Sequence, residues 1–199
     1  MEMKGHFTYN DFTSMQNPSF MEAFTTFFEK EKPKRLLEIG TAQGGTASFF
    51  RDKLNELGLN SSPLLTFEVN TVKAHERLEK IEGIELSHEN IFDHSYRNME
   101  RPELIADFIK QEGTTVVCCD GGSKSNELRL ISSLLKEGDF ILAHDYAPTL
   151  EYSKDHMVEK IWNWAEIRDE HIDKESLKLE QVYFDNFIKA AWCCFRKLA

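Results

Sequence analysis

Polar and acidic side chains follow the apolar stretches of this chain at several separate places, where they could do chemistry together. The positions in question are Glu38 with Gly40, Glu68, Asn90, Asp120, and His144 with Asp145. Carboxylates accept hydrogen bonds from hydroxyls, balance positive charge and, with imidazole, can ligate a divalent metal. Because this pattern recurs after five apolar stretches, it indicates one shared binding crevice more readily than a set of unrelated surface acids.

The first of these positions belongs to a glycine-rich turn. The segment 35–50, RLLEIGTAQGGTASFF, reads as a buried strand, a turn and the start of a helix. The glycines allow a sharp turn and close approach of a ligand to the backbone, and the helix N-terminus offers unpaired N–H groups and partial positive charge. The turn therefore suits a polar or anionic ligand group.

Two residues narrow the kind of ligand. Glu38 would repel a pyrophosphate and suits an ammonium group, and Glu68 is free to accept hydrogen bonds from ribose hydroxyls. Ala42 stands where the dinucleotide fingerprint has its second glycine. A nicotinamide-dependent dehydrogenase is therefore the least favoured alternative.

The elements that must position these residues alternate between apolar strands and amphipathic helices. We predict strands over 35–39, 64–69, 84–86, 114–119 and 140–143, and helices that begin near 18, 46, 71 and 102. A fifth helix carries Leu128, Ile131 and Leu135 and ends at Gly138. We also predict a helix over 157–167, which contains Trp162 and Trp164, and two strands without an intervening helix in 177–197. This order is typical of a doubly wound α/β fold. The expected sheet is Rossmann-like, seven-stranded and mostly parallel, with helices on both faces and an antiparallel hairpin at one edge.

Composition limits the class of protein. The 199 residues fit a single domain, 1–199, and the net charge of −10 disfavours binding to nucleic acid or to an anionic membrane. Apolar runs are far shorter than the ~20 residues that span a bilayer, and the first residues lack the apolar core of a signal peptide. We therefore expect a cytoplasmic protein. The cysteines occur as two adjacent pairs without metal or redox spacing, which predicts reduced core thiols.

The stretch LLEIGTAQGG resembles the first motif of class I S-adenosylmethionine-dependent methyltransferases, E-x-G-x-x-x-G. The wider pattern is similar to the family that groups cephalosporin hydroxylase with rhamnosyl O-methyltransferases. The matching positions, within 16–147, are Gln16-Asn17-Pro18, Pro33, Gly40-Thr41, Gly44-Gly45-Thr46, Asp120-Gly121 and His144-Asp145. The resemblance implies a methyltransferase-like domain.

The resemblance also implies roles for single residues. The cofactor S-adenosylmethionine would be bound by Glu38, Gly40, Thr41, Ala42, Gly44, Gly45, Thr46, Glu68, Asn90 and Asp120. Asp120, His144 and Asp145 stand where such relatives place ligands of Mg²⁺ or another divalent metal, usually acids and amides, so His144 departs from the pattern and is alternatively a base or a polar lid residue.

The catalytic candidates are Asp120, His144 and Lys124. Lys124 lies four residues beyond Asp120, whereas catechol-type O-methyltransferases have a lysine base three residues beyond their metal aspartate, so a solvated surface lysine is an equal alternative. Ser123 stands where the family usually has a histidine.

The implied activity is methyl transfer to an oxygen of a small molecule or sugar, with divalent-metal assistance left open. We expect the acceptor pocket to form from 1–15 and 146–176. The alternative from a different class is a module that binds the cofactor without catalysis. Whether the chain forms a homo-oligomer is not determined by the sequence.

Overall fold

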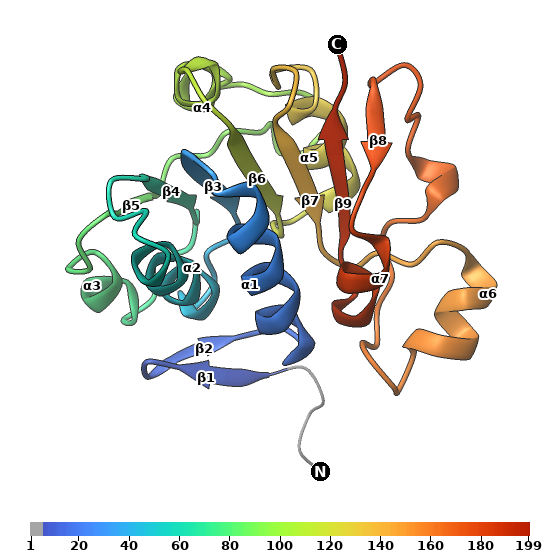
Figure 1. The fold of residues 1–199 in the computed structure, drawn as a ribbon, viewed down its shortest axis with the longest axis horizontal. Coiled ribbons are helices and arrows are strands. Elements are labelled where there is room, and N and C mark those ends of the chain that lie inside the picture. Colours follow the sequence, from blue (N-terminus) through green and yellow to red (C-terminus); the bar gives the residue numbers. More distant parts are fainter. Residues whose placement is uncertain (1–5) are drawn as a thin grey trace.

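A computed structural model describes residues 6–199, in which seven strands form a central sheet (Figure 1). In spatial order the strands are β5 (Ile84–Ser87), β4 (Leu64–Phe67), β3 (Arg35–Ile39), β6 (Thr115–Cys119), β7 (Phe140–Ala143), β9 (Cys193–Lys197) and β8 (Leu179–Gln181). The first five are parallel, and β9 runs antiparallel to both of its neighbours. The predicted fold class is thereby confirmed.

Strand β3 is the point where the order of the strands reverses. It pairs with β4 on one side and β6 on the other, and Ile39 lies opposite both Phe67 and Cys119. The carboxyl ends of these three strands are therefore level with one another. Open α/β sheets bind ligands at such a switch point, beyond the carboxyl ends of the strands.

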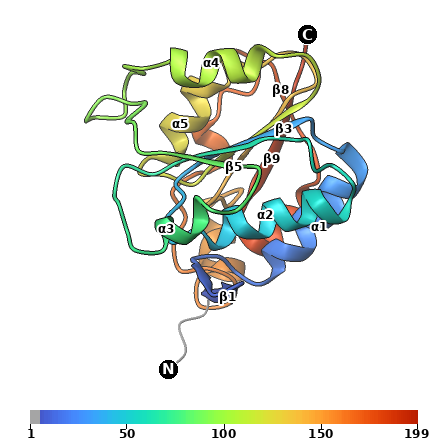
Figure 2. The ribbon, with the colours of Figure 1, turned by 90° about the vertical axis from the view of Figure 1, so that its left-hand side faces the viewer.

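Helices cover both faces of the sheet (Figure 2). The helices α1 (Ser19–Glu31), α2 (Gly45–Glu56) and α3 (His75–Leu78) lie on one face, and α4 (Glu103–Lys110) and α5 (Lys124–Ile131) on the other. Helix α1 begins after Pro18, as predicted, and buries Phe20, Phe24, Phe27 and Phe28 against the sheet. Burial of each of these rings contributes roughly 1.5–3 kcal/mol, which fixes α1 firmly to the first face.

An N-terminal hairpin was not predicted. Strands β1 (Phe7–Tyr9) and β2 (Phe12–Ser14) pair antiparallel, and both residues of their turn, Asn10 and Asp11, have positive φ. Asn and Asp tolerate this conformation better than other non-glycine residues, which explains the tight turn. The hairpin packs on α2, so it lies close to the glycine-rich turn.

Two predictions in the C-terminal part were wrong. A helix was predicted over 157–167, but the helical turns lie before it, as α6 (Leu150–Tyr152) and a π-helical turn (Ser153–Met157). The chain beyond Met157 is irregular, and Glu166 and Ile167 donate their backbone N–H groups to Asp145 O. A short 3₁₀ turn, Asp169–His171, follows.

Between β8 and β9 the chain forms α7 (Phe184–Phe187) and a 3₁₀ turn (Ile188–Ala190), although no helix was predicted there. The reason is tertiary, since Phe187 packs edge-to-face on Phe24 at 4.9 Å. The helix predicted from 71 is also shorter than expected and covers only α3.

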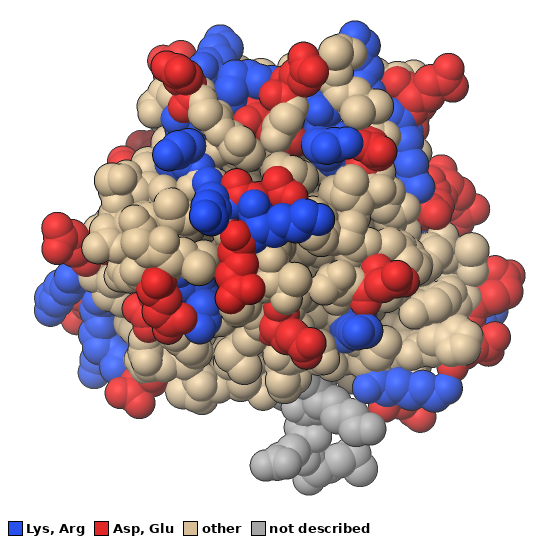
Figure 3. All heavy atoms as spheres, in the orientation of Figure 1, with Lys and Arg blue, Asp and Glu red and all other residues tan. Residues whose placement is uncertain are grey.

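Charged side chains lie on the surface of the described chain, and the cysteines lie in its core. Lys and Arg side chains are interspersed with Asp and Glu on the face shown in Figure 3, without one gathered basic patch. All four cysteines are buried and free, as predicted. Across residues 6–199 we find no helix of the length and apolarity needed to cross a membrane.

Candidate functional site

The glycine-rich turn after β3 is held by a close approach between two strand ends. Gly40 has φ +94°, and a Cβ atom added there would lie 2.2 Å from the carbonyl oxygen of Asp120 at the end of β6. No other residue type fits this position, because both the backbone conformation and the contact exclude a side chain. The fold thus brings Asp120 against the turn, as the strand-end pattern predicted.

The end of β4 is tied to the same turn. The Glu68 carboxylate accepts hydrogen bonds from the backbone N–H of Ala42 and of Asn70, each at 3.0 Å. On the other side of Ala42, its carbonyl oxygen lies 2.7 Å from Nε2 of the buried His75. Ala42 has φ +48°, an uncommon conformation for alanine, and these contacts on both sides stabilise it.

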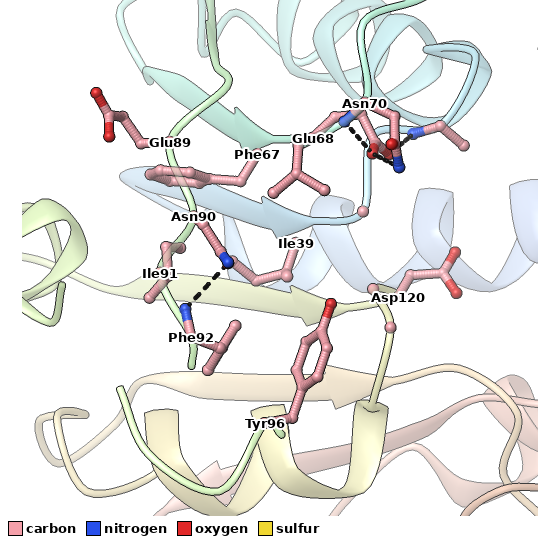
Figure 4. Close-up of a pocket in the computed structure, with 15 residues that line it drawn as sticks. Ile39, Phe67, Glu68, Asn70, Glu89, Asn90, Ile91, Phe92, Tyr96 and Asp120 are labelled. Carbon is pink, nitrogen blue, oxygen red and sulfur yellow. Dashed lines mark hydrogen bonds between the residues drawn. The ribbon is translucent and has the colours of Figure 1, made fainter. Parts of the chain in front are cut away.

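A cavity of about 280 Å³ opens beyond these strand ends (Figure 4). Five of the predicted cofactor residues line it: Gly40, Ala42, Glu68, Asn90 and Asp120. Tyr96, which sequence reasoning missed, also lines it, and its hydroxyl is packed so closely on Gly122 that a Cβ there would lie 2.3 Å away. The cavity therefore lies where the sheet topology and the sequence pattern both place a ligand.

The other predicted cofactor residues, Glu38, Thr41, Gly44, Gly45 and Thr46, do not line this cavity. A Cβ on Gly45 would lie 2.7 Å from the backbone nitrogen of Ser14, and Thr46 Oγ1 lies 3.0 Å from Ser14 Oγ. A Cβ on Gly44 would meet the side chain of Leu78 at 3.0 Å. These glycines provide the space for the N-terminal hairpin and α3 to pack against the start of α2.

Glu38 is buried in the sheet, and burial raises its pKa to about 8. The Thr66 hydroxyl donates a hydrogen bond to Glu38 Oε2 at 2.5 Å, whereas Oε1 has no hydrogen-bond partner within the described residues. Because the carboxyl is protonated through much of the neutral range, a permanent counter-charge for an ammonium group does not follow from this position.

A second group of side chains surrounds the Asp120 carboxylate, which points away from Tyr96 (Figure 4). Gln16 donates a hydrogen bond from Nε2 to Asp120 Oδ2 at 2.6 Å, and His144 Nδ1 lies 3.0 Å from Oδ1. A carboxylate only accepts, so Nδ1 of His144 carries a proton in this contact. The predicted pair of Asp120 and His144 is therefore in direct contact.

Two tryptophans hold this group in place. Trp192 donates a hydrogen bond from its indole N–H to Gln16 Oε1 at 2.8 Å, and its ring stacks on His144 at a centroid distance of 5.2 Å. Trp162 donates to Asp145 Oδ1 at 2.6 Å, while Trp164 is 64% exposed. Trp162 thus contacts the site and Trp164 does not, although the helix predicted for both residues is absent.

Lys124 is an internal ion-pair partner and not a solvated surface lysine. Its side chain is 13% exposed, and Nζ lies 3.0 Å from Asp145 Oδ2, 3.9 Å from Glu166 Oε2 and 4.0 Å from Asp120 Oδ1. Burial by itself lowers the pKa of Lys124, but these three carboxylates outweigh it, so the pKa lies above its usual value. Lys124 therefore stays an ammonium ion.

The predicted metal ligands Asp120, His144 and Asp145 do not form a site that fits a divalent ion. Within residues 6–199 there is no group of three or more His, Cys, Asp and Glu side chains placed to hold one. His144 turns its protonated Nδ1 towards Asp120, and the ammonium of Lys124 lies among the carboxylates. A cation beside Lys124 would be repelled, and Nδ1, the ring nitrogen of His144 that faces Asp120, cannot ligate a metal while it carries a proton.

Glu127 was missed by sequence reasoning. It is buried on α5, and its carboxylate accepts hydrogen bonds from the backbone N–H of Gly121 at 3.1 Å and of Ser123 at 3.0 Å. Burial raises its pKa to about 7, against the lowering effect of these bonds. Glu127 thereby fixes the turn that follows Asp120. The only signal in the sequence was an acid on the expected inner face of a helix.

Comparisons with known proteins were made on sequence and on structure. No protein-family model matches the chain, and no curated protein matches it in sequence. Among solved structures, CmcI with SAH superimposes with a TM-score of 0.63 at 14% identity, over 97% of this chain and 83% of that chain. CmcI with Mg-SAM gives 0.64 at 14% identity, over 97% and 77%. A caffeoyl-CoA O-methyltransferase, so described provisionally, from Staphylococcus aureus gives 0.55 at 11% identity, over 89% and 82%.

The chain has the fold of these methyltransferases. At such low identity the likeness extends to the fold alone. In this methyltransferase fold the cavity beyond β3, β4 and β6 occupies the switch point of the sheet.

Proposed function

We propose that the chain is a class I methyltransferase that transfers a methyl group from S-adenosylmethionine to an oxygen of a small, polar acceptor such as a sugar or a phenol. The observation that carries the proposal is the cavity at the switch point, lined by Gly40, Glu68 and Asp120. The shared fold with methyltransferases, one of them described with SAH, supports it. In this proposal residues 1–199 act as one methyltransferase-like domain.

The residues that line the cavity fit the cofactor. Glu68 now accepts hydrogen bonds from the N–H groups of Ala42 and Asn70. With the cofactor bound it would instead accept hydrogen bonds from the hydroxyl groups of the ribose, since a carboxylate accepts from N–H and O–H donors alike. Asn90 and Gly40 also line the cavity. In this proposal Asn90 would lie near the adenine, and the bare backbone of Gly40 would admit the methionine part. The cofactor supplies an activated methyl group on a sulfonium, and the electron pair of the broken C–S bond stays on sulfur.

The acceptor would lie next to Asp120, which belongs to both the cavity and the polar group behind it. Asp120 would orient the acceptor hydroxyl and take its proton as the new C–O bond forms, so that charge and atoms balance. Gln16 and His144 hold this carboxylate in one orientation by hydrogen bonds to its two oxygens. Catalysis of this kind depends mainly on alignment, which the buried network supplies.

Cofactor binding is tested by calorimetry with S-adenosylhomocysteine, the demethylated product. We expect saturable binding to the wild-type chain and about 10- to 100-fold weaker binding to Glu68→Gln, which loses a charged acceptor for two hydroxyls. Glu100→Gln is the matched control, because Glu100 is exposed and outside the cavity. Equal affinities of the two variants would refute the role of Glu68, and tight binding of NAD in place of S-adenosylhomocysteine would refute the proposal.

Methyl transfer is tested by a screen of sugars and phenols with radiolabelled S-adenosylmethionine. Transfer of label to an acceptor oxygen is the expected result. Binding of the cofactor without transfer to any acceptor would instead favour a non-catalytic binding module. The screen identifies the acceptor, and light scattering on the same protein preparation measures the oligomeric state.

A further inference from the structure

The ammonium of Lys124 lies at the centre of the acids that the sequence predicted to bind a metal. It contacts Asp145 Oδ2 at 3.0 Å and the Gly121 carbonyl oxygen at 3.0 Å, and it lies within 4.0 Å of carboxylate oxygens of Asp120 and Glu166. The acids thus already surround a cation that belongs to the chain itself.

The carboxylate oxygens around Lys124 also have other donors. Asp120 accepts from Gln16 and His144, and Asp145 Oδ1 accepts from Trp162. Glu166 Oε1 accepts from the backbone N–H and the hydroxyl of Ser125, at 3.1 and 3.3 Å. A divalent ion such as Mg²⁺ requires about six oxygen ligands in a nearly octahedral arrangement. To bind here it would have to displace Lys124 and break these hydrogen bonds.

We propose that Lys124 replaces a divalent metal in this site, and that the acceptor therefore presents one hydroxyl oxygen and not a chelating pair of oxygens. This inference rests on the proposed methyl transfer. A metal ion can hold two neighbouring oxygens of a catechol or vicinal diol at once. An ammonium has three N–H donors, and Lys124 already directs two of them to Asp145 and Gly121.

One donor of Lys124 therefore remains for the acceptor. Nζ and Asp120 Oδ1 are 4.0 Å apart, so a single oxygen can lie about 2.8 Å from both atoms. In that position the oxygen accepts from Lys124 while its own proton points to Asp120. The ammonium stabilises negative charge on the oxygen as the proton leaves, which is the contribution a metal would otherwise make.

The metal question is tested without turnover, by electron paramagnetic resonance of Mn²⁺ mixed with the wild-type chain, Lys124→Ala and Lys53→Ala. Lys53 pairs with Glu56 on the surface and serves as the control. We expect no binding of Mn²⁺ to the wild type or to Lys53→Ala at 1:1 stoichiometry, and at least about tenfold stronger binding to Lys124→Ala, where three carboxylates lose their cation. Lys124→Met, which keeps the bulk of the side chain, and a thermal melt identify any loss of fold.

Stoichiometric Mn²⁺ binding to the wild type, or no gain in folded Lys124→Ala, would overturn the replacement of a metal by Lys124. Calorimetry with S-adenosylhomocysteine on the same samples keeps the two proposals separate, because its failure would refute the methyltransferase and not the Mn²⁺ result. With acceptors in hand, we expect transfer to single hydroxyl groups to be unchanged in excess chelator. Transfer restricted to vicinal diols and abolished by chelator would overturn the inference on the acceptor.

Discussion

Gly40 and Asp120 come from strands about 80 residues apart in the chain, yet a methyl group on Gly40 would lie 2.2 Å from the Asp120 carbonyl oxygen. This contact joins the glycine-rich turn to the turn that follows β6. It places the backbone of Gly40 against the backbone of Asp120, and both residues line the cavity.

Gly40→Ala is expected to lower both the stability of the chain and its affinity for S-adenosylhomocysteine. The added methyl group meets backbone atoms that cannot rotate away, so we expect a loss of roughly 2–4 kcal/mol in the free energy of unfolding, measured with urea. Gly58→Ala separates the strain of a positive φ from the steric contact of the added methyl group. Gly58 also has positive φ, but nothing lies within 4 Å of the added Cβ. That control should lose about 1 kcal/mol. Equal losses would contradict the contact.

The buried carboxyl of Glu38 should make stability depend on pH. Its pKa is raised by burial from 4.5 to about 8, so the folded chain holds a proton that the unfolded chain has released. The contribution of Glu38 to the free energy of unfolding is therefore largest below pH 4.5. It falls as the pH rises towards 8 and changes no further above pH 8.

Glu38→Gln removes this dependence, because the amide does not titrate and its oxygen can still accept from Thr66. We expect the variant to resemble the wild type near pH 5 and to be more stable by on the order of 2–4 kcal/mol near pH 8.5. Urea titrations at the two pH values check this, with Glu100→Gln as the pH-independent control. A difference that is the same at both pH values would disprove a buried, protonated Glu38.

Gln16 links Trp192 to Asp120 and is expected to position the carboxylate. In Gln16→Met the indole N–H of Trp192 and Asp120 Oδ2 both lose their partner, which should cost about 1–3 kcal/mol of stability. Because Gln16 lies behind Asp120, we expect kcat to fall about tenfold or more while the affinity for S-adenosylhomocysteine is retained. Gln111→Met, at an exposed position, is the matched control. An unchanged kcat in Gln16→Met would limit Gln16 to a structural role.

Several features were accessible from the sequence because they depend on local pattern. The apolar runs over 35–39, 64–69 and 114–119 predicted parallel strands, and the acids at their ends predicted a shared edge. In the structure these three strands are neighbours. A strand buried on both faces must be apolar, and a turn with positive φ must contain glycine, so one sequence suffices to recognise both. These patterns predicted the fold class, and five of the residues that the family resemblance implied for cofactor binding line the cavity.

The remaining features depend on contacts between distant segments. A helix was predicted over 157–167, but the backbone N–H groups of Glu166 and Ile167 bond to Asp145 O, and Trp162 donates its indole N–H to the same residue. Gly45 reads as part of a ligand turn, but the hairpin of β1 and β2 occupies the space beside it. Neither partner can be identified from spacing along the chain.

The sequence by itself determined the sheet, its glycine turn and the edge at which its acids gather, because alternation of apolar and polar residues is a local property. Only the tertiary structure decided which residues those acids contact. Lys124 and Glu166 are 42 residues apart in the chain, and Gln16 and Trp192 are 176 apart. Such pairs meet only once the sheet has formed, and it is their charges and hydrogen bonds that turn an expected metal site into one centred on a lysine.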